Sequence, residues 1–333
     1  MPMNDAQAIL RLRNLSTRFQ TDRGTVQAVD NVSFDLFPGE TLGVVGESGC
    51  GKTVTSKSIM RLLPEHVTSF GEDSQVEFEG ENLLKLSEGQ MRRVRGNQIA
   101  MIFQEPMTAL NPVFTIGWQM DEVLRYHTDF NRSQRQARCL EMLQLVEMPN
   151  PENRLKEYPH QLSGGMRQRV MIAMALCCEP GVLIADEPTT ALDVTIQAQI
   201  LRLMNDLKRR IGTAILLITH DLGVVAQICD RVVVMYAGRV VETASVHDLF
   251  HRPQHPYTRA LLTSIPKVDS QYHGKRLPTI EGIVPSLHAL PQGCRFHDRC
   301  GYCQDLCRTE APQLEFLRPN QSVRCHFPLD EVI

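Results

Sequence analysis

The chain has 333 residues and a mass of 37.7 kDa, which corresponds to about two domains of roughly 150 residues each. Apolar residues make up 42% of the chain and charged residues 22%, so disordered, collagen-like and small disulfide-stapled chains are excluded. The net charge of -3 and the isoelectric point near 6.4 give the chain no overall basic field that would make nucleic acid or anionic lipid its main partner.

Two features predict a soluble, cytosolic chain. Residues 1–10 lack the charged segment and apolar core of a signal peptide. The longest apolar run, Val170–Cys178, is about half as long as a membrane span of ~20 residues. Five of the ten cysteines are scattered, as in a reduced compartment, whereas the other five crowd into the last 40 residues: Cys294, Cys300, Cys303, Cys307 and Cys325.

The hydrophobic pattern changes at Gly39. Before it, Val32, Phe34 and Leu36 alternate with polar residues, as in a half-buried antiparallel strand. After it, the strand signals are short continuous apolar runs. Such strands are apolar on both faces and belong to a covered parallel sheet, so the predicted fold class is α/β. The runs are Leu42–Val45, Ile99–Phe103, Val182–Ala185, Ile215–Ile218 and Val232–Met235.

The chain between the second and third of these runs has a helical pattern, for example at Ser133–Val146, and no strand signal. It predicts a helical subdomain of about residues 106–178, inserted into the sheet domain. Beyond Phe250, prolines break the pattern, which predicts an appendage with one helix at Tyr257–Ser264.

A phosphate-binding loop is predicted after the strand Leu42–Val45 and before the helical run Val54–Leu63. Its glycines allow backbone N–H groups to turn inward around an anion, and the helix N-terminus adds positive charge. Lys52 is expected to bridge the β- and γ-phosphates, and the Thr53 hydroxyl to ligate Mg²⁺. The alternative is a glycine-rich turn. The loop residues are Gly46, Glu47, Ser48, Gly49, Cys50, Gly51, Lys52 and Thr53. Cys50 offers a thiol whose alkylation would block the phosphates.

An apolar strand, Val182–Ala185, ends in two acids. An acid at the carboxyl end of a buried parallel strand points into the crevice where ligands bind. Asp186 therefore suits the water shell of Mg²⁺, and Glu187 suits the activation of an attacking water. Two acids after a strand could also form a helix cap, but the phosphate loop favours the catalytic interpretation.

The segment Gln161–Arg169 contains the sequence Ser163-Gly164-Gly165. Ser163 can cap a helix that runs to Cys178, and the two glycines leave amides free for an anion. By itself this is a helix start. Together with the loop and the acid pair, it resembles the signature of the ATP-binding-cassette (ABC) family over residues 8 to about 250.

The resemblance implies a P-loop (RecA-like) ABC nucleotide-binding domain over residues 8–250, with an N-terminal antiparallel β subdomain, the helical insertion and ATP and Mg²⁺ as cofactors. Gln104 resembles the Q-loop glutamine and His220 the switch histidine. Asp193, in Ala191-Leu192-Asp193, resembles the D-loop residue, and Phe19 the aromatic that stacks on adenine. The alternatives are a surface glutamine, a helix N-cap at Asp193 and a core strand residue at Phe19.

The carboxyl-terminal residues, 251–333, look like the extension of dipeptide and oligopeptide (peptide/nickel) importer ATPases, with the greatest likeness to the first ATPase subunits of dipeptide importers. The matching segments are His255–Leu262, Gly293–Phe296 and Val323–His326. The resemblance implies ATP hydrolysis coupled to transport at the cytoplasmic face of the bacterial inner membrane. It implies a head-to-tail dimer with a second homologous ATPase subunit, two integral permeases and a substrate-binding protein, with no nucleic acid. A nickel or other small-solute importer and a soluble non-transport ABC ATPase are the alternatives.

The cysteines of the extension need metal or disulfides to order this segment, and disulfides are disfavoured in the cytosol. Zinc ligands usually come as close C-x₂₋₄-C pairs, whereas the intervals here are five, two, three and seventeen residues. The spacing of Cys300, Cys303 and Cys307 imitates part of a ferredoxin run. The resemblance assigns a 4Fe–4S cluster to Cys294, Cys300, Cys307 and Cys325, which makes Cys303 an extra thiol. Zinc and unligated thiols remain alternatives.

Overall fold

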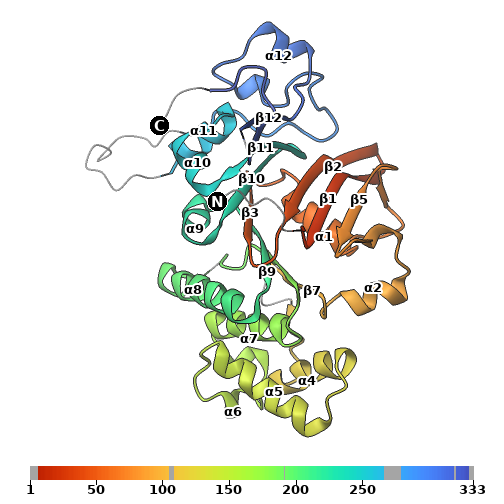
Figure 1. Cartoon of the computed structure of the whole chain (residues 1–333), viewed down its shortest axis with the longest axis vertical. Helices are drawn as coiled ribbons and strands as arrows, with labels where there is room; N and C mark the ends of the chain where they lie inside the picture. Colours follow the sequence, from red (N-terminus) through yellow and green to blue (C-terminus); the bar gives the residue numbers. More distant parts are fainter. Residues whose placement is uncertain (1–6, 105–108, 191, 266–278, 319, 330–333) are drawn as a thin grey trace, which may run out of the picture. The chain divides into compact units, whose positions relative to one another are not determined.

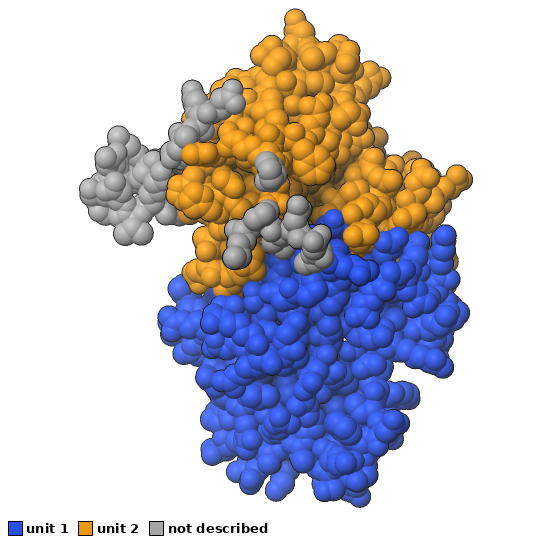
Figure 2. All heavy atoms as spheres, in the orientation of Figure 1, with its two compact units in different colours: residues 1–10, 35–41, 77–218 blue, residues 11–34, 42–76, 219–333 orange. Residues whose placement is uncertain are grey.

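The computed structural model describes residues 7–104, 109–190, 192–265, 279–318 and 320–329. The chain divides into two compact units, each assembled from segments that are far apart in the sequence (Figure 2). Unit 1 contains residues 1–10, 35–41 and 77–218, and unit 2 contains residues 11–34, 42–76 and 219–333. Ala191 and the start of the predicted helical insertion, residues 106–108, lie outside the described residues.

Unit 1 is built on three parallel strands in the order β7 (Ile99–Ile102), β8 (Val182–Asp186) and β9 (Ala214–Thr219, of which residues 214–218 belong to this unit). All of β8 and β9 is buried, as expected for a parallel sheet covered on both faces. The register pairs Ile102 with Ala185, and Asp186 with Ile218. The carboxyl ends of the three strands therefore lie side by side, and the prediction of parallel apolar strands is confirmed.

Helices fill the chain between β7 and β8, and the described residues of this stretch contain no strand. The helix α7 (Gly164–Leu176) contacts β7 and α8 (Val194–Ile211) as well as α4 (Ile116–His127) and α5 (Arg132–Leu145). The short α6 (Pro151–Arg154) contacts α5 (Figure 1). Polar caps begin the longer helices, because a side-chain oxygen satisfies an N–H group of the first turn. The cap residues are Thr115, Asn131 and Ser163.

Several short elements precede β7 in the sequence. Unit 1 also contains the short strand β6 (Glu81–Asn82), which pairs with β5 (Gln75–Phe78), and the helix α2 (Glu88–Val94). Ser87 and Gln90 form a capping box at the start of α2, a pairing that satisfies two backbone N–H groups at once.

Unit 2 holds most of β1 (Leu10–Thr21) and β2 (Gly24–Leu36), together with β4 (Thr68–Phe70), which pairs antiparallel with β1. Val32, Phe34 and Leu36 of β2 are buried, with exposed fractions of 6% or less. The residues between them, Ser33 and Asp35, are half-buried. The alternating strand predicted for this segment is therefore confirmed.

The second sheet of unit 2 has the strand order β12-β13-β11-β10-β3. β3 (Thr41–Val45) is parallel to β10 (Arg231–Tyr236), and β11 (Arg239–Ser245) is antiparallel to β10. The sequence pattern does not predict the last two strands, β12 (Glu315–Arg318) and β13 (Gln321–Val323), which pair antiparallel and add the extension to β11. β13 has only three residues, two of them buried and polar, so it carries no apolar periodicity.

The helices of unit 2 are α1 (Lys52–Ile59), α9 (Leu222–Ile228), α10 (Val246–His251), α11 (Pro256–Thr263) and α12 (Asp305–Thr309). α1 is shorter than the predicted run Val54–Leu63. Arg61 adopts a positive φ of 48°, and a residue in this left-handed conformation ends a helix. In the part of the chain that the structure describes, no helix combines the length and the apolar character that a membrane crossing requires.

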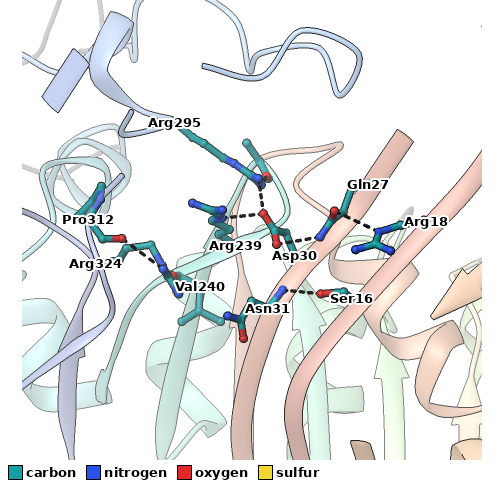
Figure 3. A network of polar contacts seen from close by, with 11 residues as sticks. Ser16, Arg18, Gln27, Asp30, Asn31, Arg239, Val240, Arg295, Pro312 and Arg324 are labelled. Atoms are coloured by element: carbon teal, nitrogen blue, oxygen red, sulfur yellow. Dashed lines mark hydrogen bonds and ion pairs between the residues drawn. The ribbon is translucent and has the colours of Figure 1, made fainter. Parts of the chain in front are cut away.

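An ion-pair network anchors the extension within unit 2 (Figure 3). Oδ2 of Asp30, in β2, accepts hydrogen bonds from Nε of Arg239 at 2.8 Å and from the guanidinium of Arg295. Arg295 also donates to the carbonyl of Ala237 at 2.5 Å. Arg324 donates to the carbonyls of Val240 and Pro312 at 2.8 and 3.3 Å. The extension is thus bound to β2 and β11 by charged side chains.

Candidate functional site

The glycine-rich segment begins directly after β3, and its last two residues, Lys52 and Thr53, start α1, so the predicted strand–loop–helix arrangement is confirmed. Gly46 and Gly51 have φ values of 151° and 95°. A Cβ atom would lie 2.2 Å from the Met235 carbonyl oxygen at Gly46, and 2.6 Å from the Ala28 carbonyl oxygen at Gly51. The loop therefore requires glycine at both positions, because its backbone approaches neighbouring strands closely.

Lys52, the first residue of α1, is 5% exposed. Its ammonium group donates to the carbonyl oxygens of Gly46 and Glu47 at 2.8 and 3.0 Å. These contacts keep the positive charge at the loop, where the helix N-terminus also favours an anion. Thr53 follows in the first turn of α1, with its side chain half-buried. The geometry is that of an anion-binding loop with one fixed cation.

Cys50 is fully buried within the loop. Burial is the main cause that raises the pKa of its thiol. Only the thiolate reacts quickly with alkylating reagents, and a buried thiol with a raised pKa is inert. The expectation that Cys50 is open to alkylation is therefore wrong, because the sequence could not show that this side chain points into the protein.

Unit 1 contains the two acids and the glutamine predicted beside the phosphates. Asp186, at the end of β8, is 2% exposed. The next residue, Glu187, accepts hydrogen bonds at Oε2 from Nε2 of Gln104 at 3.0 Å and from Oγ1 of Thr190 at 2.9 Å. Gln104 follows β7, so two neighbouring parallel strands bring these side chains together. Their carboxylate and amide oxygens are ligands of the kind that Mg²⁺ prefers.

The backbone of Glu187 is unusual. Its φ is 49°, and its N–H donates to the carbonyl of Ile218 at the end of β9, at 2.8 Å. A left-handed conformation costs a residue other than glycine about 1–3 kcal/mol, and such strain clusters at functional sites. The neighbouring strand therefore holds the backbone of Glu187 in this conformation.

The signature segment also lies in unit 1. Ser163 is exposed and caps α7, where its hydroxyl accepts from the Met166 N–H at 3.4 Å. Gly164 and Gly165 form the first turn of this helix. Asp193 is the N-cap of α8, and its carboxylate accepts from the Ile196 N–H at 2.9 Å. The cap predicted as an alternative for Asp193 is therefore present.

The two remaining predicted residues belong to unit 2. His220 is exposed and directly precedes Asp221, the N-cap of α9. Phe19 lies half-buried in β1, paired with Thr68 of β4. The structure thus brings together Gln104 and Glu187 in unit 1 and the loop residues in unit 2.

Four of the clustered cysteines, Cys294, Cys300, Cys307 and Cys325, line one small pocket in the extension, and Cys303 does not. The Cys294 N–H donates to the Cys307 carbonyl at 2.8 Å. Burial, and then the neighbouring thiols, raises the pKa of Cys294 to about 11 and that of Cys325 to about 12. Among the described residues, no three His, Cys, Asp or Glu side chains are arranged to hold a metal ion.

The fully buried His255 lines the same pocket. Burial lowers its pKa to about 3, so the imidazole is neutral. Its Nδ1 accepts from the Tyr257 N–H at 3.0 Å, which places the proton on Nε2. This buried Nε2 has no hydrogen-bond partner among the described residues. The pocket therefore places four thiols and the buried imidazole of His255 around one small cavity.

Comparisons with known proteins agree with this geometry. The ABC transporter family matches residues 29–190, and the family "Oligopeptide/dipeptide transporter, C-terminal region" matches residues 241–307. A probable peptide ABC transporter ATP-binding protein, y4tR of Sinorhizobium fredii, is 55% identical over 96% of this chain and 95% of its own length. The chain belongs to the family of ABC transporter ATP-binding proteins.

Other members of this family align over nearly their full length. The dipeptide transport ATP-binding protein DppD of Bacillus subtilis is 51% identical, over 96% of this chain and 94% of its own. DppD of Escherichia coli is 47% identical, over 97% and 98%. Among solved structures, the dimeric post-hydrolysis ATP-binding cassette MJ0796 bound to ADP and Pi has a TM-score of 0.63 and 26% identity. The match covers 71% of this chain and 98% of the MJ0796 chain. The predicted ABC cassette fold is therefore confirmed.

Proposed function

We propose that this protein is the ATP-binding and ATP-hydrolysing subunit that energises a membrane importer of dipeptides or oligopeptides. The observation that carries this proposal is the pair of family matches on one chain, an ABC cassette followed by a peptide-transporter extension. The relatives named for dipeptide transport support the cargo.

Each predicted site residue has a defined role in this proposal. Lys52 and the amides of the loop bind the phosphates. Thr53, Asp186 and Gln104 would hold Mg²⁺, which neutralises phosphate charge when bound. Glu187 accepts the proton of the attacking water, and its bonds to Gln104 and Thr190 orient its carboxylate. His220 donates to the γ-phosphate, and Phe19 stacks on the adenine.

The signature residues act on a second nucleotide. In the proposed head-to-tail dimer, Ser163, Gly164 and Gly165 contact the ATP held by the loop of a second, homologous ATPase subunit, and Asp193 lies at the junction. ATP binding closes this dimer and hydrolysis reopens it. Two integral permeases receive this motion at the cytoplasmic face of the bacterial inner membrane, and a substrate-binding protein selects the cargo. The translocase is thus an assembly, and the cassette itself never contacts the cargo.

Uptake of a labelled dipeptide tests the cargo. Cells that lack this chain are complemented with the wild-type protein or the Glu187→Gln variant, and nickel uptake is followed in parallel. We expect wild type alone to restore dipeptide uptake. If cells without this chain lose nickel uptake and keep dipeptide uptake, the protein is instead the ATPase subunit of a nickel importer. Loss of neither would favour a soluble non-transport ATPase.

We also propose that Cys294, Cys300, Cys307 and Cys325 hold a 4Fe–4S cluster, with Zn²⁺ as the alternative. The proposal is supported by the pocket that these four thiols share and by the buried N–H of His255. A structural role is favoured over electron transfer, because the cluster would tie Cys325, after β13, to residues 294–307.

Replacing Cys300 by Ser tests this site. We expect the variant, purified without oxygen, to lose most of the iron and acid-labile sulfide of the wild type and to become more sensitive to proteolysis in the extension. Cys303→Ser is the matched control, since Cys303 does not line the pocket, and it should keep its iron. Zinc in place of iron would support the alternative metal, and iron content unchanged by Cys300→Ser would contradict the ligand assignment.

A further inference from the structure

The extension reaches the phosphate-binding loop through Arg299. Two nitrogens of its guanidinium donate to the two carboxylate oxygens of Glu47, at 2.7 and 3.0 Å. The Arg299 side chain is only 4% exposed. Its remaining donors contact the carbonyls of Glu281 and Ile280 at 2.9 and 3.3 Å and the Tyr236 hydroxyl at 3.3 Å. A bidentate pair of this kind is strongly directional, so Arg299 fixes the position of the Glu47 carboxylate.

Tyr257, in α11, makes the second contact. Its hydroxyl accepts a hydrogen bond from the backbone N–H of Glu47 at 2.8 Å. The ring is fully buried and packs against Tyr236 and Phe296, with ring centroids 4.6 and 5.3 Å away. The guanidinium carbon of Arg299 lies 5.8 Å from the Tyr236 ring centroid. Backbone and side chain of the same loop residue are thus both held by the extension.

The charge of Glu47 links these contacts to the binding of phosphate. A carboxylate inside a phosphate-binding loop repels the triphosphate, because like charges disfavour each other at short range. Arg299 pairs with this carboxylate and offsets its charge, while the Glu47 side chain stays 29% exposed. We propose that Arg299 and Tyr257 are positioning residues of the phosphate-binding loop, through which the carboxyl-terminal extension sets the affinity of this cassette for ATP.

A double-mutant cycle on the full-length chain tests the inference, with Mg·ATP titrated by calorimetry. We expect Arg299→Ala to raise the Kd for ATP by about ten- to a hundredfold, which corresponds to ~1.4–2.8 kcal/mol. In a Glu47→Gln background the same substitution should change the Kd by less than about threefold, since no charge is left to neutralise. Arg299→Lys keeps the positive charge but cannot make the bidentate contact, so its Kd for ATP should lie between those of the wild type and Arg299→Ala.

Controls separate positioning from general destabilisation. Arg308→Ala removes an exposed arginine of the same extension and should leave the Kd at the wild-type value. If Arg299→Ala does not fold, Arg299→Lys and Tyr257→Phe are tested in its place, and both should raise the Kd for ATP severalfold. The melting temperature of each variant shows whether it is folded.

Two results would overturn the inference: a wild-type Kd in the Arg299 variants, or an equal rise in the Glu47→Gln background. The inference rests on the proposed ATP-binding function, yet the two fail differently. A wild-type protein that does not bind ATP would refute the function, whereas wild-type binding without any effect of Arg299 would refute only the role of the extension.

Discussion

The Glu187→Gln protein should bind ATP but hydrolyse it about 10²–10⁴-fold more slowly, the size of contribution expected from a general base. The amide has the shape of the carboxylate, and its oxygen can still accept the bonds from Gln104 and Thr190. It cannot take the proton of the attacking water. Because ATP then stays bound, the variant should accumulate as a closed, inactive dimer with its partner subunit.

Phosphate release and size-exclusion chromatography with ATP measure these two effects. Glu179→Gln is the matched control, because Glu179 also has a positive φ, 53°, and its side chain is 61% exposed. It should hydrolyse ATP at the wild-type rate. Turnover of Glu187→Gln at the wild-type rate would show that another group is the base.

Removal of the Asp30 carboxylate should destabilise unit 2 by about 3 kcal/mol, at the lower end of what an unpaired buried charge costs. The Asp30 side chain is 15% exposed, and that of Arg295 10%. Burial, followed by repulsion from Arg239, lowers the pKa of Arg295, and the same two causes lower the pKa of Arg324 to about 10. Asp30 acts against both shifts. Without it, three neighbouring guanidinium groups repel one another (Figure 3).

Thermal unfolding of the Asp30→Ala protein measures this loss, which corresponds to a melting temperature lowered by about 6–12 °C for a unit of this size. Asp22→Ala, in the exposed turn after β1, should shift stability by less than ~0.5 kcal/mol. Asp30→Asn should recover part of the loss, because the amide oxygen still accepts hydrogen bonds. A melting temperature of Asp30→Ala equal to that of wild type would mean that other contacts anchor the extension.

Much of the cassette could be predicted from local sequence. The five short apolar runs became strands because a continuous apolar segment is stable only where both faces of a sheet are covered. Ser163 caps its helix as expected, and Asp193 forms the cap that was predicted as its alternative, since capping depends on residues within one turn. The same locality explains the failures. α1 ends early at a backbone conformation that its composition does not encode.

The structure of the extension is the part that local sequence predicts least. Its sequence predicted one helix and a group of thiols, and α11 is present. β13 is too short to show a sequence pattern, and it forms by pairing with the edge of β11.

The amino-acid sequence alone therefore determined the chemistry of this protein: the glycine-rich loop with its lysine, the acid pair after a strand, and the signature turn. Each of these is a short-range pattern. The tertiary structure alone decided that Cys50 is buried, that Gln104 bonds Glu187, and that Arg299 pairs with Glu47 across 252 positions of the chain. Such contacts depend on packing between distant segments, and no local pattern of residues encodes them.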